Sequence, residues 1–199
     1  MYNVKRAMLG GFAAGLMVCA MSLGATAQSS GSSSSSSGSK LSAADKTFVD
    51  KAAQGGQAEV ELGQLAADKG QSQQVKEFGQ KMVQDHTKAN DQLKQVASQE
   101  GITLPTSLDA KDKALKDRLE KLSGAQFDKV YMQHMVQDHK KDIADFQKEA
   151  QSGKDPAVKN FAQQTLPVLQ QHLQMAQTDE QAMNQGKSNG QTTASNQPQ

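Results

Sequence analysis

Apolar side chains recur every three or four positions from about residue 41 to residue 183, rather than at every second position. This spacing is typical of amphipathic helices, and the same stretch is poor in β-branched residues, which favour strands. The pattern therefore predicts an all-α domain with four long helices, near residues 42–69, 72–100, 123–152 and 155–183.

Polar and special residues mark the predicted helix ends. Ser42 stands at the N-cap position of the first helix, and Asp155 followed by Pro156 opens the last one. Glycine is a common residue just beyond the end of a helix. The predicted stops are Gly70, Gly101 and Gly153.

The connections between the helices differ in length, which indicates the topology. The first and third connections are short turns, so each joins two antiparallel helices into a hairpin. Residues 102–122 form a much longer joint that begins with ITLP and continues with LDAKDKALKDRLEKL, a stretch that fits a short surface helix. Two hairpins joined by one long crossover are typical of a ferritin-like four-helix bundle.

Each predicted helix carries one ionisable side chain on its apolar face: Glu59, His86, His139 and His172. Two of these histidines end a repeated pentamer, MVQDH, at residues 82–86 and 135–139. Burying such groups without partners costs on the order of several kcal/mol. We therefore expect them to pair with one another, with water or with a metal ion.

Three imidazoles and one carboxylate on facing helices predict a site for a divalent first-row metal such as Zn, Fe, Mn or Cu, with Glu59, His86, His139 and His172 as ligands. Nearby acids that could orient the histidines are Asp85, Asp138 and Asp142. The alternative is a hydrogen-bonded polar network in the core that holds no metal.

Two further observations bear on the kind of metal chemistry. Methionines lie within about a turn of the histidines, and thioethers together with imidazoles favour copper; the same methionines also fit as core filler. They are Met82, Met132, Met135 and Met175. The sequence contains no Glu-x-x-His, the motif of di-iron ferritin sites. We therefore expect a binding or structural protein rather than a metal-dependent oxidoreductase, and we assign no catalytic residue.

The ends of the chain differ in composition from its middle. Residues 1–27 have a short basic start, a small-residue apolar run and Ala-Thr-Ala, the layout of a secretory signal cleaved after Ala27. Lipidation at Cys19 is an alternative. Residues 28–40 read as a Ser-rich flexible tether, residues 41–183 as the bundle and residues 184–199 as a disordered polar tail. We thus expect an exported protein with no membrane span after cleavage.

Charge and cysteine content exclude several classes of function. Cleavage removes Lys5 and Arg6, which leaves 20 basic residues against 21 acidic ones, and it removes the single cysteine. Without a basic surface or tryptophan we expect no nucleic-acid partner. Disulfide and thiolate sites are excluded as well. A partner in the envelope or outer membrane remains open, and so does the oligomeric state.

Four blocks of the sequence resemble one bacterial exported family, domain of unknown function 4142. They are FVDKAAQGGQAEVELGQLA, FGQKMVQDHTKAND, LSGAQFDKVYMQHMVQDHK and TLPVLQQHLQMA, and the resemblance spans roughly residues 44–178. It implies a ferritin-like bundle in the cell envelope. It also implies that the family's Glu and three His fall on Glu59, His86, His139 and His172, with His134 outside the set.

Overall fold

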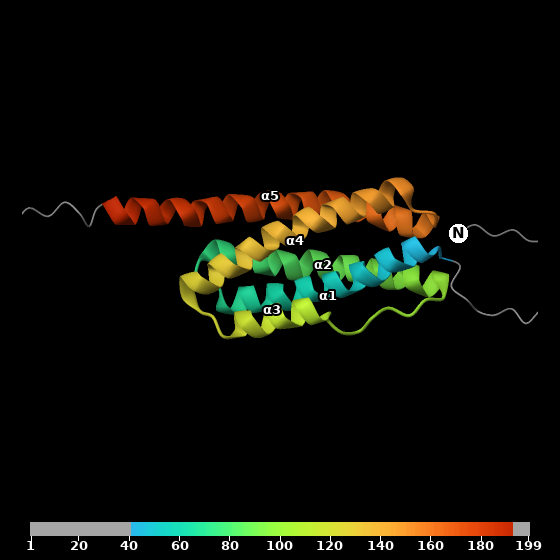
Figure 1. The fold of residues 1–199 in the computed structure, drawn as a ribbon, viewed down its shortest axis with the longest axis horizontal. Helices are drawn as coiled ribbons and strands as arrows, with labels where there is room; N and C mark the ends of the chain where they lie inside the picture. The colour runs from blue at the N-terminus through green and yellow to red at the C-terminus, as the bar shows by residue number, and fades with distance from the viewer. Residues whose placement is uncertain (1–40, 193–199) are drawn as a thin grey trace, which may run out of the picture. The chain divides into compact units, whose positions relative to one another are not determined.

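The computed structural model of the protein describes residues 41–192, in which the chain is helical and contains no strand. Its elements are α1 (Ala43–Lys69), α2 (Gln73–Glu100), α3 (Ala110–Glu120), α4 (Gly124–Ser152) and α5 (Pro156–Thr192) (Figure 1). The predicted signal segment at 1–27 and the tether at 28–40 lie outside the described residues. The prediction of an all-α fold with four long helices is confirmed.

Side-chain caps start the helices where the sequence predicted. The Ser42 hydroxyl accepts a hydrogen bond from the backbone N–H of Asp45 at 3.1 Å. The Asp155 carboxylate accepts from the backbone N–H groups of Ala157 and Val158 at 2.9 and 3.0 Å. These oxygens satisfy N–H groups that have no partner inside the first helical turn. The first and last helices therefore begin at their predicted residues.

The helices pack as two hairpins joined by a long crossover. α1 packs along α2, and α4 packs along α5 (Figure 1); α1 also contacts α4, and α2 contacts α5. The crossover contains the predicted short helix, α3, which packs on α1 and α4 and buries Leu119. The four long helices thus form the ferritin-like bundle that the connection lengths predicted.

An aspartate at the start of each hairpin binds the turn of the other hairpin. The Asp128 carboxylate, in the first turns of α4, accepts from the backbone N–H groups of Gln71 and Ser72, both at 2.8 Å. The Asp45 carboxylate, in the first turn of α1, accepts from Lys154 N–H at 3.1 Å and Asp155 N–H at 3.0 Å. Both aspartates are buried. We call these two sets of bonds the reciprocal aspartate locks.

Glycine allows α1 and α2 to cross closely. A Cβ atom on Gly63 would lie 2.9 Å from the carbonyl oxygen of Gly79, and one on Gly79 would lie 2.6 Å from the carbonyl oxygen of Gly63. Both distances are shorter than real Cβ contacts. Gly63 and Gly79 therefore permit a backbone approach that any side chain would block, whereas a Cβ on Gly55 would meet no atom within 4 Å.

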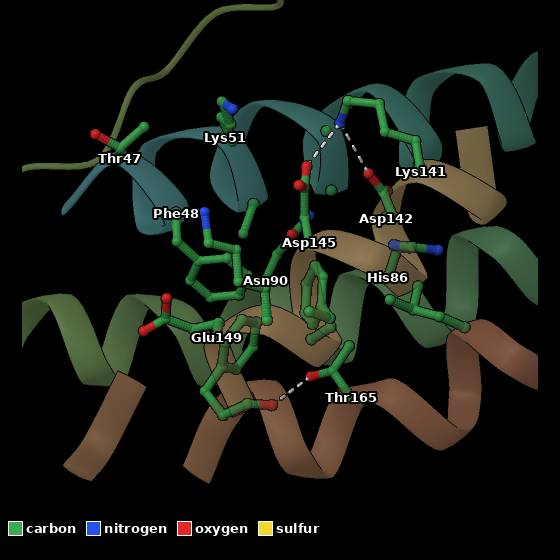
Figure 2. A pocket seen from close by; sticks show the side chains of 18 of the residues that line it. Thr47, Phe48, Lys51, His86, Asn90, Lys141, Asp142, Asp145, Glu149 and Thr165 are labelled. Atoms are coloured by element: carbon green, nitrogen blue, oxygen red, sulfur yellow. Dashed lines mark hydrogen bonds and ion pairs between the residues drawn. The ribbon is translucent and has the colours of Figure 1, made fainter. Parts of the chain in front are cut away.

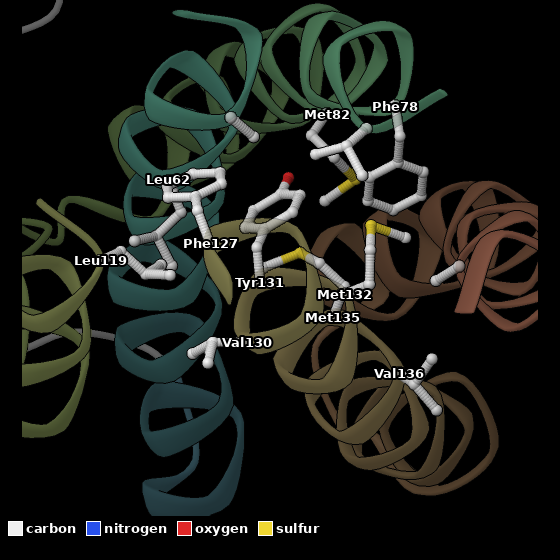
Figure 3. Packing of buried hydrophobic residues seen from close by; sticks show 13 residues of the cluster. Leu62, Phe78, Met82, Leu119, Phe127, Val130, Tyr131, Met132, Met135 and Val136 are labelled. Atoms are coloured by element: carbon white, nitrogen blue, oxygen red, sulfur yellow. The ribbon is translucent and has the colours of Figure 1, made fainter. Parts of the chain in front are cut away.

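Two apolar clusters fill the bundle. The first contains Phe78, Phe127, Tyr131 and the buried methionines of α2 and α4 (Figure 3). The second contains three mutually packed rings, with 4.9 Å between the centroids of Phe48 and Phe146 and 5.8 Å between those of Phe146 and Phe161. Burial of these large side chains is the main source of stability for a bundle of this kind.

α5 continues to Thr192, past Met183, where we expected the helix to end and an irregular tail to begin. Extending a helix is far easier than starting one, because each added residue gains a hydrogen bond for only two fixed dihedral angles. Residues 193–199 of the predicted tail lie outside the described residues. Over residues 41–192, no helix combines the length and the apolar character that a bilayer crossing requires.

Candidate metal centre

Three histidines from three helices meet in the middle of the bundle. His86 on α2, His139 on α4 and His172 on α5 are 6%, 0% and 0% exposed. One ring nitrogen from each lies within 4.8 Å of the other two. The ring centroids are 5.9 Å apart for His86 and His139, 5.3 Å for His86 and His172, and 5.4 Å for His139 and His172. The structure therefore brings together the three histidines that the helical pattern placed inward.

Hydrogen bonds fix the orientation of two of these rings. His139 Nδ1 lies 3.0 Å from the carbonyl oxygen of Met135, so it carries the proton and donates. His172 Nε2 lies 2.8 Å from a carboxylate oxygen of Asp85 and likewise donates. The unpartnered buried nitrogens are then Nε2 of His139, Nδ1 of His172 and Nε2 of His86. A metal-binding histidine usually donates a hydrogen bond from one ring nitrogen and binds the ion through the other.

Lys81 also holds Asp85 in place beside His172. The Asp85 carboxylate accepts from Lys81 Nζ at 2.9 Å on the same helix. Partial burial raises the pKa of Asp85, but the hydrogen bonds from Lys81 and His172 outweigh burial and lower it. Asp85 therefore stays ionised and orients His172, although it is the chain neighbour of His86.

Burial keeps the three imidazoles neutral. It lowers the pKa of His86 well below the ordinary value, and the nearby His139 and His172 add to this effect. Burial also lowers the pKa of His139 to about 4, and it lowers that of His172 despite the opposing effect of Asp85. A neutral imidazole has the lone pair that a metal ion requires, so no proton need leave these rings near neutral pH.

Glu59, the predicted fourth ligand, lies beside the three histidines rather than among their free nitrogens. It is 1% exposed on α1, and its Oε1 is 3.9 Å from His139 Nδ1, the nitrogen that donates to Met135. Burial raises the pKa of Glu59 well above the ordinary value, and the charges of Asp138 and Asp142 raise it further. The Glu59 carboxyl faces Asp138, although no hydrogen bond of normal geometry joins the two.

The other predicted acids lie around Glu59. Asp138 is 3.5 Å from Lys111 Nζ, and Asp142 is 3.4 Å from Lys141 Nζ. Burial and the charge of Asp138 raise the pKa of Asp142 to about 7. Of the three acids predicted to orient the histidines, only Asp85 forms a hydrogen bond with one of them in the described structure.

Unsatisfied polar atoms are concentrated at this level of the bundle. Seven buried side-chain nitrogen or oxygen atoms within the described residues have no hydrogen-bond partner. Six of them belong to Glu59, His86, Tyr131, His139 and His172. Each unsatisfied buried group costs about 1–3 kcal/mol, so such a cluster indicates a position built to receive an ion or ordered water.

Buried methionines adjoin the histidines. Met82 and Met135 precede His86 and His139 by four residues, so each lies one turn away on the same helix face. With Met132 they are fully buried, and Figure 3 shows their sulfur atoms turned toward one another. Met175 is partly buried at the margin of the same cluster. Each copy of the MVQDH pentamer thus places a methionine thioether and, one helical turn further along, a histidine imidazole in the core.

Sequence reasoning missed the two aspartates of the reciprocal locks and the unsatisfied hydroxyl of Tyr131. The lock residues carried a signal, because Asp45 and Asp128 both open an Asp-Lys dipeptide followed two residues later by an aromatic ring. Tyr131 carried no such signal, because nothing in the sequence around it shows that its buried hydroxyl lacks a hydrogen-bond partner.

Comparisons with known proteins agree with this fold. The family described as Domain of unknown function (DUF4142) matches residues 30–178. No curated protein matches. The crystal structure of a DUF305 fragment from Deinococcus radiodurans is similar, with a TM-score of 0.62 and 14% identity over 73% of this chain and 98% of that chain. At that identity the likeness shows the fold alone. The family match covers most of the chain, including all four predicted ligands, and the protein therefore belongs to the DUF4142 family.

Proposed function

We propose that this protein binds one divalent first-row transition metal through His86, His139 and His172, and that it holds or transfers the ion without chemical turnover. The observation that carries the proposal is that one ring nitrogen of each buried histidine lies within 4.8 Å of the other two, and that each ring has a buried nitrogen without a hydrogen-bond partner. Zn, Cu and Fe are the metals that imidazole ligands suit best.

The distances support this assignment. Nitrogen ligands lie about 2.0–2.1 Å from zinc in tetrahedral sites, which sets neighbouring ligand nitrogens a little over 3 Å apart. Nitrogens that already lie within 4.8 Å reach that arrangement through small ring movements. Three protein ligands leave a fourth position for water or another ligand.

Glu59 has a supporting role in this proposal. Its closest approach to the histidines is at Nδ1 of His139. We assign it to balancing the charge of the bound ion, because a divalent cation among three neutral rings needs a nearby carboxylate.

Metal content tests the proposal directly. Elemental analysis of protein purified from its native source, followed by equilibrium dialysis against Zn, Co(II), Cu, Mn and Fe, should give one bound ion per chain. The variants His86→Ala, His139→Ala and His172→Ala should lose it. His134→Ala is the matched control, since His134 lies on α4 outside the cluster, and it should keep the ion. No uptake by wild type, or equal loss in the His134 variant, contradicts the proposal.

The same contacts also favour one alternative, a polar core network that holds no metal. The hydrogen bonds of His139 to Met135 and of His172 to Asp85 are those that such a network requires. In that case His86→Ala would reduce stability, and wild type would take up no metal in dialysis.

We further propose that the protein is exported to the cell envelope, where a stress-related role in metal handling would operate. The support is the signal-like composition of residues 1–27. Cell fractionation combined with intact mass measurement should find a chain that starts at Gln28 outside the cytoplasm. A cytoplasmic chain that keeps residues 1–27 contradicts this part of the proposal.

A further inference from the structure

The two hairpins are copies of one another in sequence, offset by 83 positions. Residues 70–82, GQSQQVKEFGQKM, align with residues 153–165, GKDPAVKNFAQQT, and five of the aligned residues are identical. The same offset relates Asp45-Lys46 to Asp128-Lys129. This repeat differs from the MVQDH pentamer, whose copies lie 53 positions apart.

The reciprocal aspartate locks verify this alignment in three dimensions. Asp128 binds the N–H groups of residues 71 and 72, and Asp45 binds those of residues 154 and 155, which are the same positions shifted by 83. The helix-ending glycines also correspond. Gly70 has φ −50° and ψ 137°, and Gly153 has φ −53° and ψ 143°. Each half of the bundle therefore has a structural counterpart in the other.

The three histidines come from both hairpins, and they occupy only one of the two sites that the repeat relates. His86 corresponds to Leu169, which is of similar size, whereas His139, His172 and three neighbouring core residues correspond to smaller side chains. The pairs are Phe127 with Ala44, Met135 with Ala52, His139 with Gly56, His172 with Ala89 and Met82 with Thr165. All five smaller residues line one pocket of about 240 Å³ (Figure 2). The pocket therefore occupies the place that these larger side chains fill at the repeat-related site.

This pocket reaches one of the three histidines. His86 is part of its lining, so a metal ligand borders the cavity directly (Figure 2). Lys141 lies on the wall beside Asp142 and Asp145, 3.4 and 3.1 Å from their carboxylates. Deeper, the wall is apolar and is formed by the three packed phenylalanines and Leu169.

We infer that this pocket admits a small anionic Lewis base to the fourth coordination position of the metal, on the side of His86. The inference rests on the proposed function, because it requires a metal held by the three histidines. Three neutral imidazoles contribute no negative charge and Glu59 balances only part of the charge of a divalent ion, so an anion is the favoured fourth ligand. The volume is below the usual range for ligand sites, and the apolar wall suits a short hydrocarbon body such as that of a short-chain carboxylate.

The test uses the full chain loaded with Co(II), whose visible spectrum reports on its ligands. Titration with azide, and separately with butyrate, should change the spectrum of wild type in a saturable way. Two variants that fill the pocket, Gly55→Leu and Ala52→Leu, should keep one Co(II) per chain but bind azide at least tenfold more weakly. A Cβ at Gly55 has open space around it, which makes this variant compatible with folding.

A size-matched control and distinct outcomes separate the two proposals. Gln95→Leu adds an apolar side chain on the exposed face of α2 and should bind azide as wild type does. Bound Co(II) with a spectrum unaffected by either anion overturns the pocket inference alone. Equal azide affinity in wild type and both filled variants overturns it as well. Failure of wild type to bind Co(II) overturns the proposed function and this inference together.

Discussion

Asp85 illustrates how a single side chain determines which nitrogen of a histidine is free. Because its carboxylate accepts from His172 Nε2 at 2.8 Å, the lone pair of His172 is on Nδ1, which is buried and has no hydrogen-bond partner. His139 is oriented in the same sense by the Met135 carbonyl. Both rings are therefore preorganised for an ion by groups that would not touch it.

We predict that Asp85→Asn weakens metal binding about 10–100-fold while all three histidines remain. The amide keeps the shape of the carboxylate but loses the charge that orients the His172 ring. Asp91→Asn is the control, because Asp91 lies on the same helix with its side chain 61% exposed. Competition with a coloured chelator measures both affinities. Equal affinities in the two variants would rule out the orienting role of Asp85.

The inward positions of the three histidines could be predicted from the sequence because a helix places every third and fourth residue on one face. The hydrogen-bond partners could not. His172 and Asp85 are 87 positions apart, and their contact depends on how two hairpins pack. The sequence correctly predicted that Glu59 is buried. Its position beside Nδ1 of His139 depends on how far α1 is shifted along the bundle axis relative to α4, which helical periodicity does not specify.

The reciprocal aspartate locks fix the position of the two hairpins relative to one another along the bundle axis. Each buried aspartate fixes the turn of the opposite hairpin relative to the first turns of its own helix. Neither hairpin therefore slides along the other without breaking these four hydrogen bonds. Burial raises the pKa of Asp45, but the bonds from the Lys154 and Asp155 backbone outweigh burial and lower it. Asp45 thus stays ionised as the stronger acceptor.

We predict that Asp128→Ala lowers the free energy of unfolding by about 3 kcal/mol, because two hydrogen bonds to a charged acceptor are lost. Urea denaturation followed by circular dichroism measures this change. Asp117→Ala on α3 is the control, with a side chain 51% exposed, and should change stability by less than about 0.5 kcal/mol. If the two variants are equally stable, the lock does not hold the hairpins.

At the scale of the whole bundle, a carboxyl group beside the second hairpin turn makes the stability of the fold depend on pH. Burial, and then the charge of Asp45, raises the pKa of Glu149 to about 7 from the ordinary 4.5. Between these values the folded protein keeps a proton that the unfolded chain releases. The stability that the protonated carboxyl contributes is therefore full below pH 4.5 and is lost as the pH rises through 7.

We predict that Glu149→Gln reduces the loss of stability between about pH 5 and pH 8, because the amide cannot ionise. Urea midpoints of wild type and variant, measured across this range, should diverge as the pH rises, with the variant more stable at the alkaline end. Parallel curves would show that Glu149 ionises in the folded protein as it does in the unfolded chain.

Anomalous diffraction from crystals grown with Zn or Co(II) tests most directly whether the three histidines form a metal centre. The expected result is one strong peak inside the bundle, about 2.0–2.1 Å from Nε2 of His86, Nε2 of His139 and Nδ1 of His172. Metal found only at surface carboxylates, with the three rings left without a peak between them, would contradict the account.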